Sequence, residues 1–227
     1  MSVTAQVGAP PFLKTHSAHL MTNNKSDKMA IRQQMRKKRS ALPAHRQHLA
    51  SSALAKKVLG NIPAMHHADR IAFYLSQDGE IHLLPLMSHC YKQGRQYFLP
   101  VLDPTTENTL RFAEWTPDRI MSKNKYGIAE PVVPEQQLLS AGDMELIFMP
   151  LVAFDACGHR LGMGGGYYDR SLADCSKGTD SSANPLLVAT GHDIQYVPHL
   201  PHDNWDITPD ITITPDRIIK PVPQVET

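Results

Sequence analysis

The sequence predicts an α/β fold: a single domain in which a largely parallel sheet, flanked by helices, forms a three-layer sandwich. Two observations carry this prediction. Short apolar segments broadly alternate with segments of helical periodicity, as in α/β proteins. The most apolar segment, residues 145–152 (ELIFMPLV), lacks polar alternation and is typical of a central strand buried on both faces.

The elements follow from periodicity and from their terminating residues. A first helix is expected over residues 27–42, because Ser26 or Asp27 can cap it and its apolar residues lie near one face. Pro43 opens a second helix, which Gly60 ends. Further strands are expected at 70–75, 96–101, 109–115, 186–190 and 211–214, and further helices at 82–93 and 167–173. We expect the strand at 109–115 to be the more exposed one, residues 116–143 to be loop-rich, and 175–184 to form a solvent loop.

The chain has 227 residues, which allows one domain. We place the domain at residues 27–220, between a disordered N-terminal tail (1–26) and a C-terminal tail (221–227). The N-terminal tail has no clear apolar period, and Gly8, Pro10 and Pro11 break any helix. Met21 is a plausible alternative start.

Composition excludes several classes of protein. Lys and Arg number 23 against 22 Asp and Glu, so a main task of coating nucleic acid or anionic membrane is not expected. No stretch approaches about 18 uninterrupted apolar residues, which argues against a membrane span. The three cysteines lack CxxC spacing, which disfavours a disulfide scaffold and favours a reducing, cytoplasmic location. The 12 histidines contain no HxH or HExxH pair, so a zinc site is disfavoured.

One segment carries most of the chemistry. Residues 154–170 (FDACGHRLGMGGGYYDR) follow the most apolar strand and precede a helix. Closely spaced glycines let backbone N–H groups approach a ligand, and a helix N-terminus adds positive charge, which together favour phosphate binding. Arg160 can meet phosphate oxygens as a fork, and Asp169 can hold Mg²⁺ beside them. Neither GxxxxGK[ST] nor GxGxxG is present. The alternative is a glycine-rich turn packed under the sheet.

Other candidate positions are weaker. Lys28 and Arg32 are one helical turn apart and share a face of the helix. They either bind a ligand together or form a solvated basic face. Glu80 follows a predicted strand end, where ligand sites of α/β folds gather. The alternative to a ligand-binding role is a carboxylate that only stabilises the turn. Asp206 and Asp210 lie near another strand and are either metal-facing or turn residues.

Residues 160–169 (RLGMGGGYYD) resemble the 5-formyltetrahydrofolate cyclo-ligase family, also called methenyltetrahydrofolate synthetases. The resemblance runs from about residue 28 to residue 219 and includes weaker matches in the same order: KMAIR at 28–32, LSQDGEI at 75–81, LRFAEW at 110–115 and YGIAEP at 126–131. Three positions depart from the family pattern. Gly165 stands where some relatives have Lys, His192 stands where the residue is usually aromatic or apolar, and Tyr126 stands where others have Trp or Phe.

The resemblance implies a set of site residues. ATP would be bound by Lys28, Arg32, Arg160, Leu161, Gly162, Met163, Gly164, Gly165, Gly166, Tyr167 and Tyr168, with Arg160 and Tyr168 as catalytic residues. The folate would be bound by Leu75, Glu80, Tyr126, Gly165 and Tyr167. Mg²⁺ would be held by Asp169 and Asp206.

The resemblance implies ATP- and Mg²⁺-dependent conversion of 5-formyltetrahydrofolate to 5,10-methenyltetrahydrofolate through a phosphorylated N5-formyl intermediate, within one-carbon metabolism. Its partners would be ATP and the folate, with or without a polyglutamate tail, and neither nucleic acid nor membrane. We expect a monomer. Two alternatives remain at this point: another ATP-dependent enzyme on the same scaffold, because a phosphate loop does not fix the second substrate, and a non-catalytic binder using the basic helix at residues 36–39.

Overall fold

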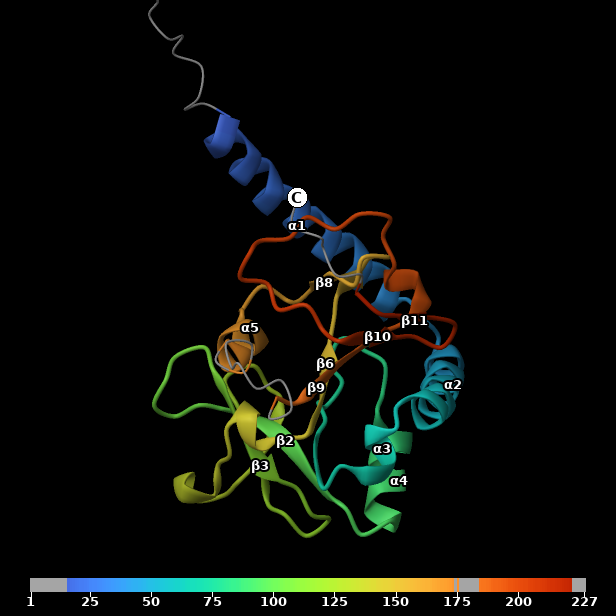
Figure 1. Ribbon diagram of the computed structural model, residues 1–227, viewed down its shortest axis with the longest axis vertical. Helices are drawn as coiled ribbons and strands as arrows, with labels where there is room; N and C mark the ends of the chain where they lie inside the picture. The colour runs from blue at the N-terminus through green and yellow to red at the C-terminus, as the bar shows by residue number, and fades with distance from the viewer. Residues whose placement is uncertain (1–15, 174, 176–183, 222–227) are drawn as a thin grey trace, which may run out of the picture.

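The computed structural model describes residues 16–173, 175 and 184–221, with backbone only for 16–23 (Figure 1). The sequence predictions for residues 1–15 and 222–227, and most of the loop predicted at 175–184, lie outside this part of the chain. Within it, no helix combines the length and the apolar character that a bilayer crossing requires.

A seven-stranded sheet forms the centre, and its five inner strands are parallel. The two edge strands are antiparallel to their neighbours. In spatial order the strands are β11 (Ile218–Ile219), β10 (Ile211–Ile213), β9 (Leu186–Thr190), β6 (Leu146–Pro150), β1 (Arg70–Ala72), β2 (Gln96–Leu102) and β3 (Leu110–Glu114). The predicted α/β class with a largely parallel sheet is confirmed.

Helices and loops cover both faces of the sheet, which completes the three layers (Figure 1). Both faces of the sheet are covered because both carry apolar side chains. On strand β6, Leu146 and Phe148 pack into one core cluster, whereas Ile147 and Met149 pack into another. The first cluster lies under α2 (Ala44–Asn61), α3 (Ala64–His67) and α4 (Leu84–Lys92). The second lies under the short α5 (Tyr167–Leu172) and the 3-10 helix η2 (Ala141–Asp143).

Helix α1 (His16–Ser40) begins well before the predicted Asp27. Part of the predicted N-terminal tail is therefore helical. The expected caps, Ser26 and Asp27, lie inside the helix. Just before them, the Asn24 side chain donates to Asp203 Oδ1 at 3.0 Å, which joins this part of the helix to a distant loop. Further along, Met35 packs with Val152 and Leu161, which anchors the helix across the carboxyl ends of the parallel strands (Figure 1).

The other departures from prediction are short elements. Strand β3, which was expected to be the more exposed strand, lies at the sheet edge but is not exposed, because Phe112 is buried in the second core cluster. Two antiparallel hairpins were not predicted, β4 (Met121–Lys123) with β5 (Ala129–Pro131) and β7 (Ala153–Phe154) with β8 (Arg160–Leu161). Neither were α3, the edge strand β11, or the 3-10 helices η1 (Glu135–Gln137), η2 and η4 (Asp193–Gln195). Strands of two or three residues leave too few positions for a detectable period.

Candidate active site

The candidate site lies where neighbouring parallel strands diverge. From β1 the chain continues to β2 on one side, whereas β6 lies on the other side of β1. In open α/β sheets such a switch point leaves a crevice at the carboxyl ends of the strands. A cavity of about 1130 Å³ opens there, lined by Tyr74 and Leu75 after β1 and by Pro150 and Leu151 at the end of β6.

The glycine segment forms one wall of this cavity. It runs from β8 to α5 and includes two glycines with positive φ, Gly164 (98°) and Gly166 (66°). A Cβ on Gly164 would lie 3.3 Å from Arg32 Cζ, so glycine permits the close approach of that guanidinium. Arg32 Nε also donates to the Gly162 carbonyl at 2.9 Å. Because α5 has only six residues, its dipole adds less charge than the sequence suggested.

The Gly165 departure is accompanied by a nearby arginine. A Cβ at position 165 would lie 2.8 Å from Tyr167 Cδ2, so a larger residue requires that ring to move. The Arg170 guanidinium donates to the Gly165 carbonyl. Arg170 therefore brings a cation to the position where some relatives have Lys.

Lys28 reaches the cavity from α1 and is nearly buried. Its Nζ is 2.7 Å from Asp203 Oδ2 and 2.7 Å from Asp206 Oδ2. Burial lowers the pKa of Lys28, but the two carboxylates outweigh burial, so the net shift is upward. A cation shared by two carboxylates leaves one negative charge in excess, which favours binding of a further cation.

The predicted metal ligands are adjacent. The N–H of Ile207, the residue after Asp206, donates to Asp169 Oδ1 at 3.1 Å. Asp169 Oδ1 also accepts from Arg160 Nη2 at 2.6 Å. Within the described residues, Asp169 Oδ2 and Asp206 Oδ1 accept no hydrogen bond. Two carboxylates with free oxygens beside the glycine segment suit Mg²⁺, which takes one or two carboxylates together with phosphate oxygens and water.

The cavity also combines aromatic rings with a buried acid. Tyr126 and Tyr167 hydroxyls lie 2.8 Å apart, with their rings edge to face. Glu80 is 8% exposed, and burial raises its pKa. Burial also raises the pKa of Tyr168, so its hydroxyl stays protonated at neutral pH and can donate a hydrogen bond.

All the predicted site residues line this one cavity. The structure adds others that sequence reasoning missed: Asn24, Gln77, Asp78, Asn124, Asp203 and Trp205. Trp205 is 69% exposed, and its position next to Asp206 was the only signal that it could reach the site. Asp210, the alternative metal candidate, instead accepts a hydrogen bond from the Leu187 N–H and is a turn residue.

Comparison with known proteins assigns the chain to a family. The model of the 5-formyltetrahydrofolate cyclo-ligase family matches residues 24–215. The chain belongs to this family. The match includes every predicted site residue.

Individual relatives agree with the family model. A 5-formyltetrahydrofolate cyclo-ligase of Haemophilus influenzae is 38% identical over 81% of this chain and 95% of its own length. That of Escherichia coli K12 is 33% identical over 81% of this chain and 98% of its own length. The solved structure of Aquifex aeolicus 5,10-methenyltetrahydrofolate synthetase superposes with a TM-score of 0.70 at 27% identity, covering 88% of this chain and 96% of that one. The chain is thus an enzyme of the cyclo-ligase family.

Proposed function

We propose that this cyclo-ligase family member converts 5-formyltetrahydrofolate and ATP into 5,10-methenyltetrahydrofolate, ADP and phosphate in the presence of Mg²⁺. The observation that carries the proposal is that one cavity is lined both by the glycine segment with Lys28, Arg32 and Arg160 and by Glu80 with Tyr126 and Tyr167. Its volume of about 1130 Å³ exceeds the usual range for single-ligand sites, about 300–1000 Å³, which supports a site for two substrates.

Lys28, Arg32, Arg160 and the backbone N–H groups of residues 162–166 would hold the ATP phosphates. Glu80, Leu75 and Tyr126 would hold the folate, with Tyr167 at the junction of the two substrates. Bound Mg²⁺, held by Asp169 and Asp206, would neutralise phosphate charge.

In the reaction, the formyl oxygen on N5 attacks the γ-phosphorus of ATP, and ADP leaves. N10 then attacks the formyl carbon of the resulting iminium phosphate and loses its proton. The carbon–oxygen bond breaks, phosphate leaves, and the methenyl ring remains. The protein contributes alignment of the two substrates and stabilisation of the transferring phosphoryl group. We propose that the Tyr168 hydroxyl, which burial keeps protonated, donates a hydrogen bond during these steps.

The test is direct. Purified protein is mixed with 5-formyltetrahydrofolate, ATP and Mg²⁺, and the absorbance of the methenyl product is followed. We expect product only when all three are present, with one ADP formed per methenyl group. ATP turnover without methenyl formation would support a different ATP-dependent enzyme, and neither product would support a binding protein.

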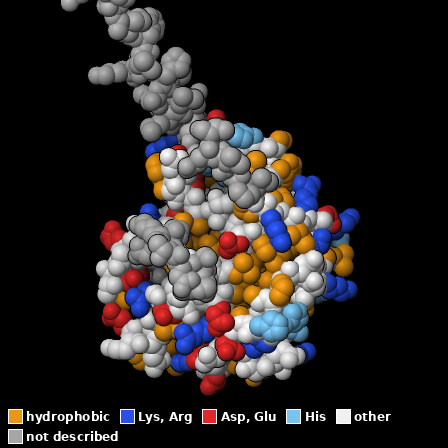
Figure 2. All heavy atoms as spheres, viewed as in Figure 1, with side chains coloured by type: hydrophobic (Ala, Val, Ile, Leu, Met, Phe, Trp, Pro, Cys, Tyr) orange, Lys and Arg blue, Asp and Glu red, His pale blue; other side chains and the backbone are white. Residues whose placement is uncertain are grey.

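The remaining expectations are a monomer in the cytoplasm that binds neither nucleic acid nor membrane. The net charge of +1 supports the expectation for nucleic acid and anionic membrane, and Figure 2 shows acidic and basic side chains together on the viewed face. Size-exclusion chromatography with light scattering measures the oligomeric state.

A further inference from the structure

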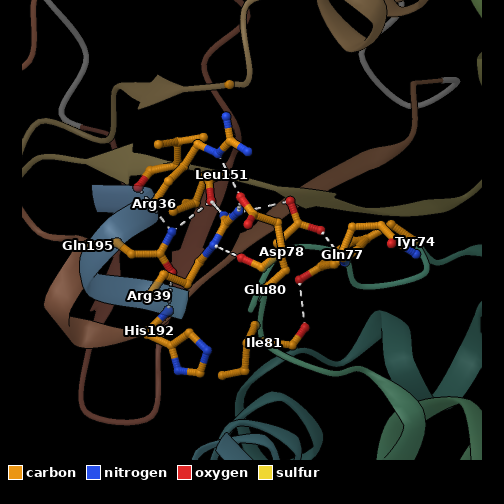
Figure 3. Close-up of polar contacts among 12 residues, drawn as sticks. Arg36, Arg39, Tyr74, Gln77, Asp78, Glu80, Ile81, Leu151, His192 and Gln195 are labelled. Atoms are coloured by element: carbon orange, nitrogen blue, oxygen red, sulfur yellow. Dashed lines mark hydrogen bonds and ion pairs between the residues drawn. The ribbon is translucent and has the colours of Figure 1, made fainter. Parts of the chain in front are cut away.

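Arg39, in the last turn of α1, is fully buried (Figure 3). Burying a guanidinium is costly unless its donors are paired with acceptors. Its Nε donates to the Asp78 carbonyl at 2.8 Å, and its Nη2 donates to Asp78 Oδ2 at 3.1 Å. A single buried side chain therefore holds both the backbone and the side chain of one residue in the turn after β1.

That turn is fitted closely against the end of α1. Asp78 and Gly79 have positive φ values of 49° and 73°. A Cβ on Gly79 would lie 3.0 Å from the Arg39 carbonyl oxygen. The turn thus packs backbone to backbone on the helix, at a distance that requires glycine.

The same turn determines where the Glu80 carboxylate lies. Glu80 Oε2 accepts the Gln77 N–H at 3.0 Å, and Oε1 faces Arg39 Nη1 at 3.7 Å. Arg39 Nη1 also donates to the Leu151 carbonyl at 3.3 Å, just after β6. Arg39, a residue of α1, therefore joins the Glu80 turn to the end of β6 (Figure 3). Both α1 and the end of β6 contribute residues to the cavity lining.

We propose that Arg39 is a positioning residue for folate binding, which holds the Glu80 carboxylate in place and acts on the substrate only through it. The inference rests on the proposed function insofar as Glu80 contacts the folate. Arg39 itself does not line the cavity, and its guanidinium faces Glu80 from the protein side. The same helix carries Lys28 and Arg32, which would bind the ATP phosphates. Arg39 therefore also fixes the position of Glu80 relative to these two cations.

Arg36 provides a matched control. It lies on the same helix, and its Nε donates to the same carboxylate oxygen, Asp78 Oδ2, at 2.6 Å. Its side chain is 48% exposed, however, and it forms no ion pair with Glu80 within the described part of the chain. Exposed ion pairs contribute little, so loss of the Arg36 fork leaves the turn held by Arg39.

The experiment compares Arg39→Lys with Arg36→Lys, because both variants keep the charge and remove the fork. We expect Arg39→Lys to raise the KM for 5-formyltetrahydrofolate about ten-fold, the size of one lost charge-assisted hydrogen bond. The KM for ATP and kcat should stay within about two-fold, as should all constants of Arg36→Lys. Equal increases in both KM values, or no difference between the two variants, would overturn the inference.

A double variant tests the route through Glu80. If Arg39 acts through Glu80, adding Arg39→Lys to Glu80→Gln raises the folate KM no further than Glu80→Gln alone. Full additivity would mean that Arg39 acts elsewhere. Should Arg39→Lys fold poorly, Asp78→Asn weakens the same contact from the exposed side, and the folate KM should rise by a smaller factor. An unchanged KM in that variant would also count against the inference.

Hydrogen exchange separates this inference from the proposed function. In protein without substrates, Arg39→Lys should speed amide exchange over residues 76–82, whereas Arg36→Lys should not. If the wild type makes no methenyl product but exchange is faster in Arg39→Lys, the proposed function fails and the hold of Arg39 on the turn stands. If the wild type is active and neither exchange nor the folate KM changes, the role of Arg39 fails alone.

Discussion

Arg160 donates a hydrogen bond from Nη2 to Oδ1 of Asp169 over 2.6 Å, and Arg160 is 7% exposed. The cation expected to meet phosphate and the carboxylate expected to hold Mg²⁺ thus neutralise each other before either ligand binds. Arg160 Nε has no hydrogen-bond partner among the described residues. A buried donor left unpaired is costly, so this N–H is free to donate to a ligand oxygen.

Asp169→Asn should lower kcat at least ~10²-fold, because a metal clamp supplies several kcal/mol in phosphoryl transfer. Asparagine keeps the shape and an acceptor oxygen for the Ile207 N–H, so folding should be preserved. Steady-state turnover across a Mg²⁺ titration measures the effect, with the exposed Asp118→Asn as control. Near-normal turnover at limiting Mg²⁺ would show that Asp169 is not a metal ligand.

Arg160→Lys should lose roughly ten-fold or more in kcat, on the scale of a charge-assisted hydrogen bond at ~1.5–3 kcal/mol. Lysine keeps the charge but cannot pair two phosphate oxygens as a fork. Because charge spreads over the phosphoryl oxygens in the transition state, we expect kcat to fall more than the KM for ATP rises. Arg160→Ala serves as the reference for complete loss, and wild-type kinetics in both variants would reduce Arg160 to a turn residue.

A chain beginning at Met21 should keep its activity, because it retains Asn24, Lys28 and Arg32. A chain beginning at Ala30 loses Asn24 and Lys28, which leaves Asp203 and Asp206 without the shared cation. We expect the shorter chain to be impaired in ATP use, seen as a higher KM for ATP. Lys28→Met in the full chain removes the ammonium group but keeps the helix, so it separates the two effects. Equal activity of all the variants would mean that Lys28 has only a structural role.

His192 should make stability depend on pH. Burial lowers its pKa from 6.5 to about 4, and the ring is 3% exposed. Between these two values the unfolded state binds the proton and the folded state does not, so the free energy of unfolding rises with pH over this window, by about 3 kcal/mol in total.

Denaturant unfolding between pH 4 and 8 measures this dependence. His192→Leu should flatten the profile over that window while leaving stability at pH 8 nearly unchanged, and the exposed His199→Gln should not alter it. A profile of unchanged slope in His192→Leu would assign the dependence to other groups.

The sequence was sufficient for the class and for most long elements. Buried strands such as β6 carry a continuous apolar pattern, and α2 begins directly after Pro43. The glycine segment was also recognisable, because its residues are contiguous in the chain. By contrast, Ser26 and Asp27 suggested a helix cap, but α1 already begins at His16. The contact between Asn24 of this helix and the distant Asp203 could not be predicted from the sequence.

Contacts between distant residues were decided by the tertiary structure. Lys28 and Asp206 are separated by 178 positions, and Arg39 and Leu151 by 112, so no local pattern could pair them. The sequence alone determined which residue types were available: the glycines, the cations, the carboxylates and their strand-end positions. Their convergence on one cavity required the parallel sheet, because the strand order places the ends of β1 and β6 side by side and lets α1 cross above them. Burial of apolar surface drives that arrangement, and it depends on contacts along the whole chain. A sequence motif is local and therefore cannot specify those contacts.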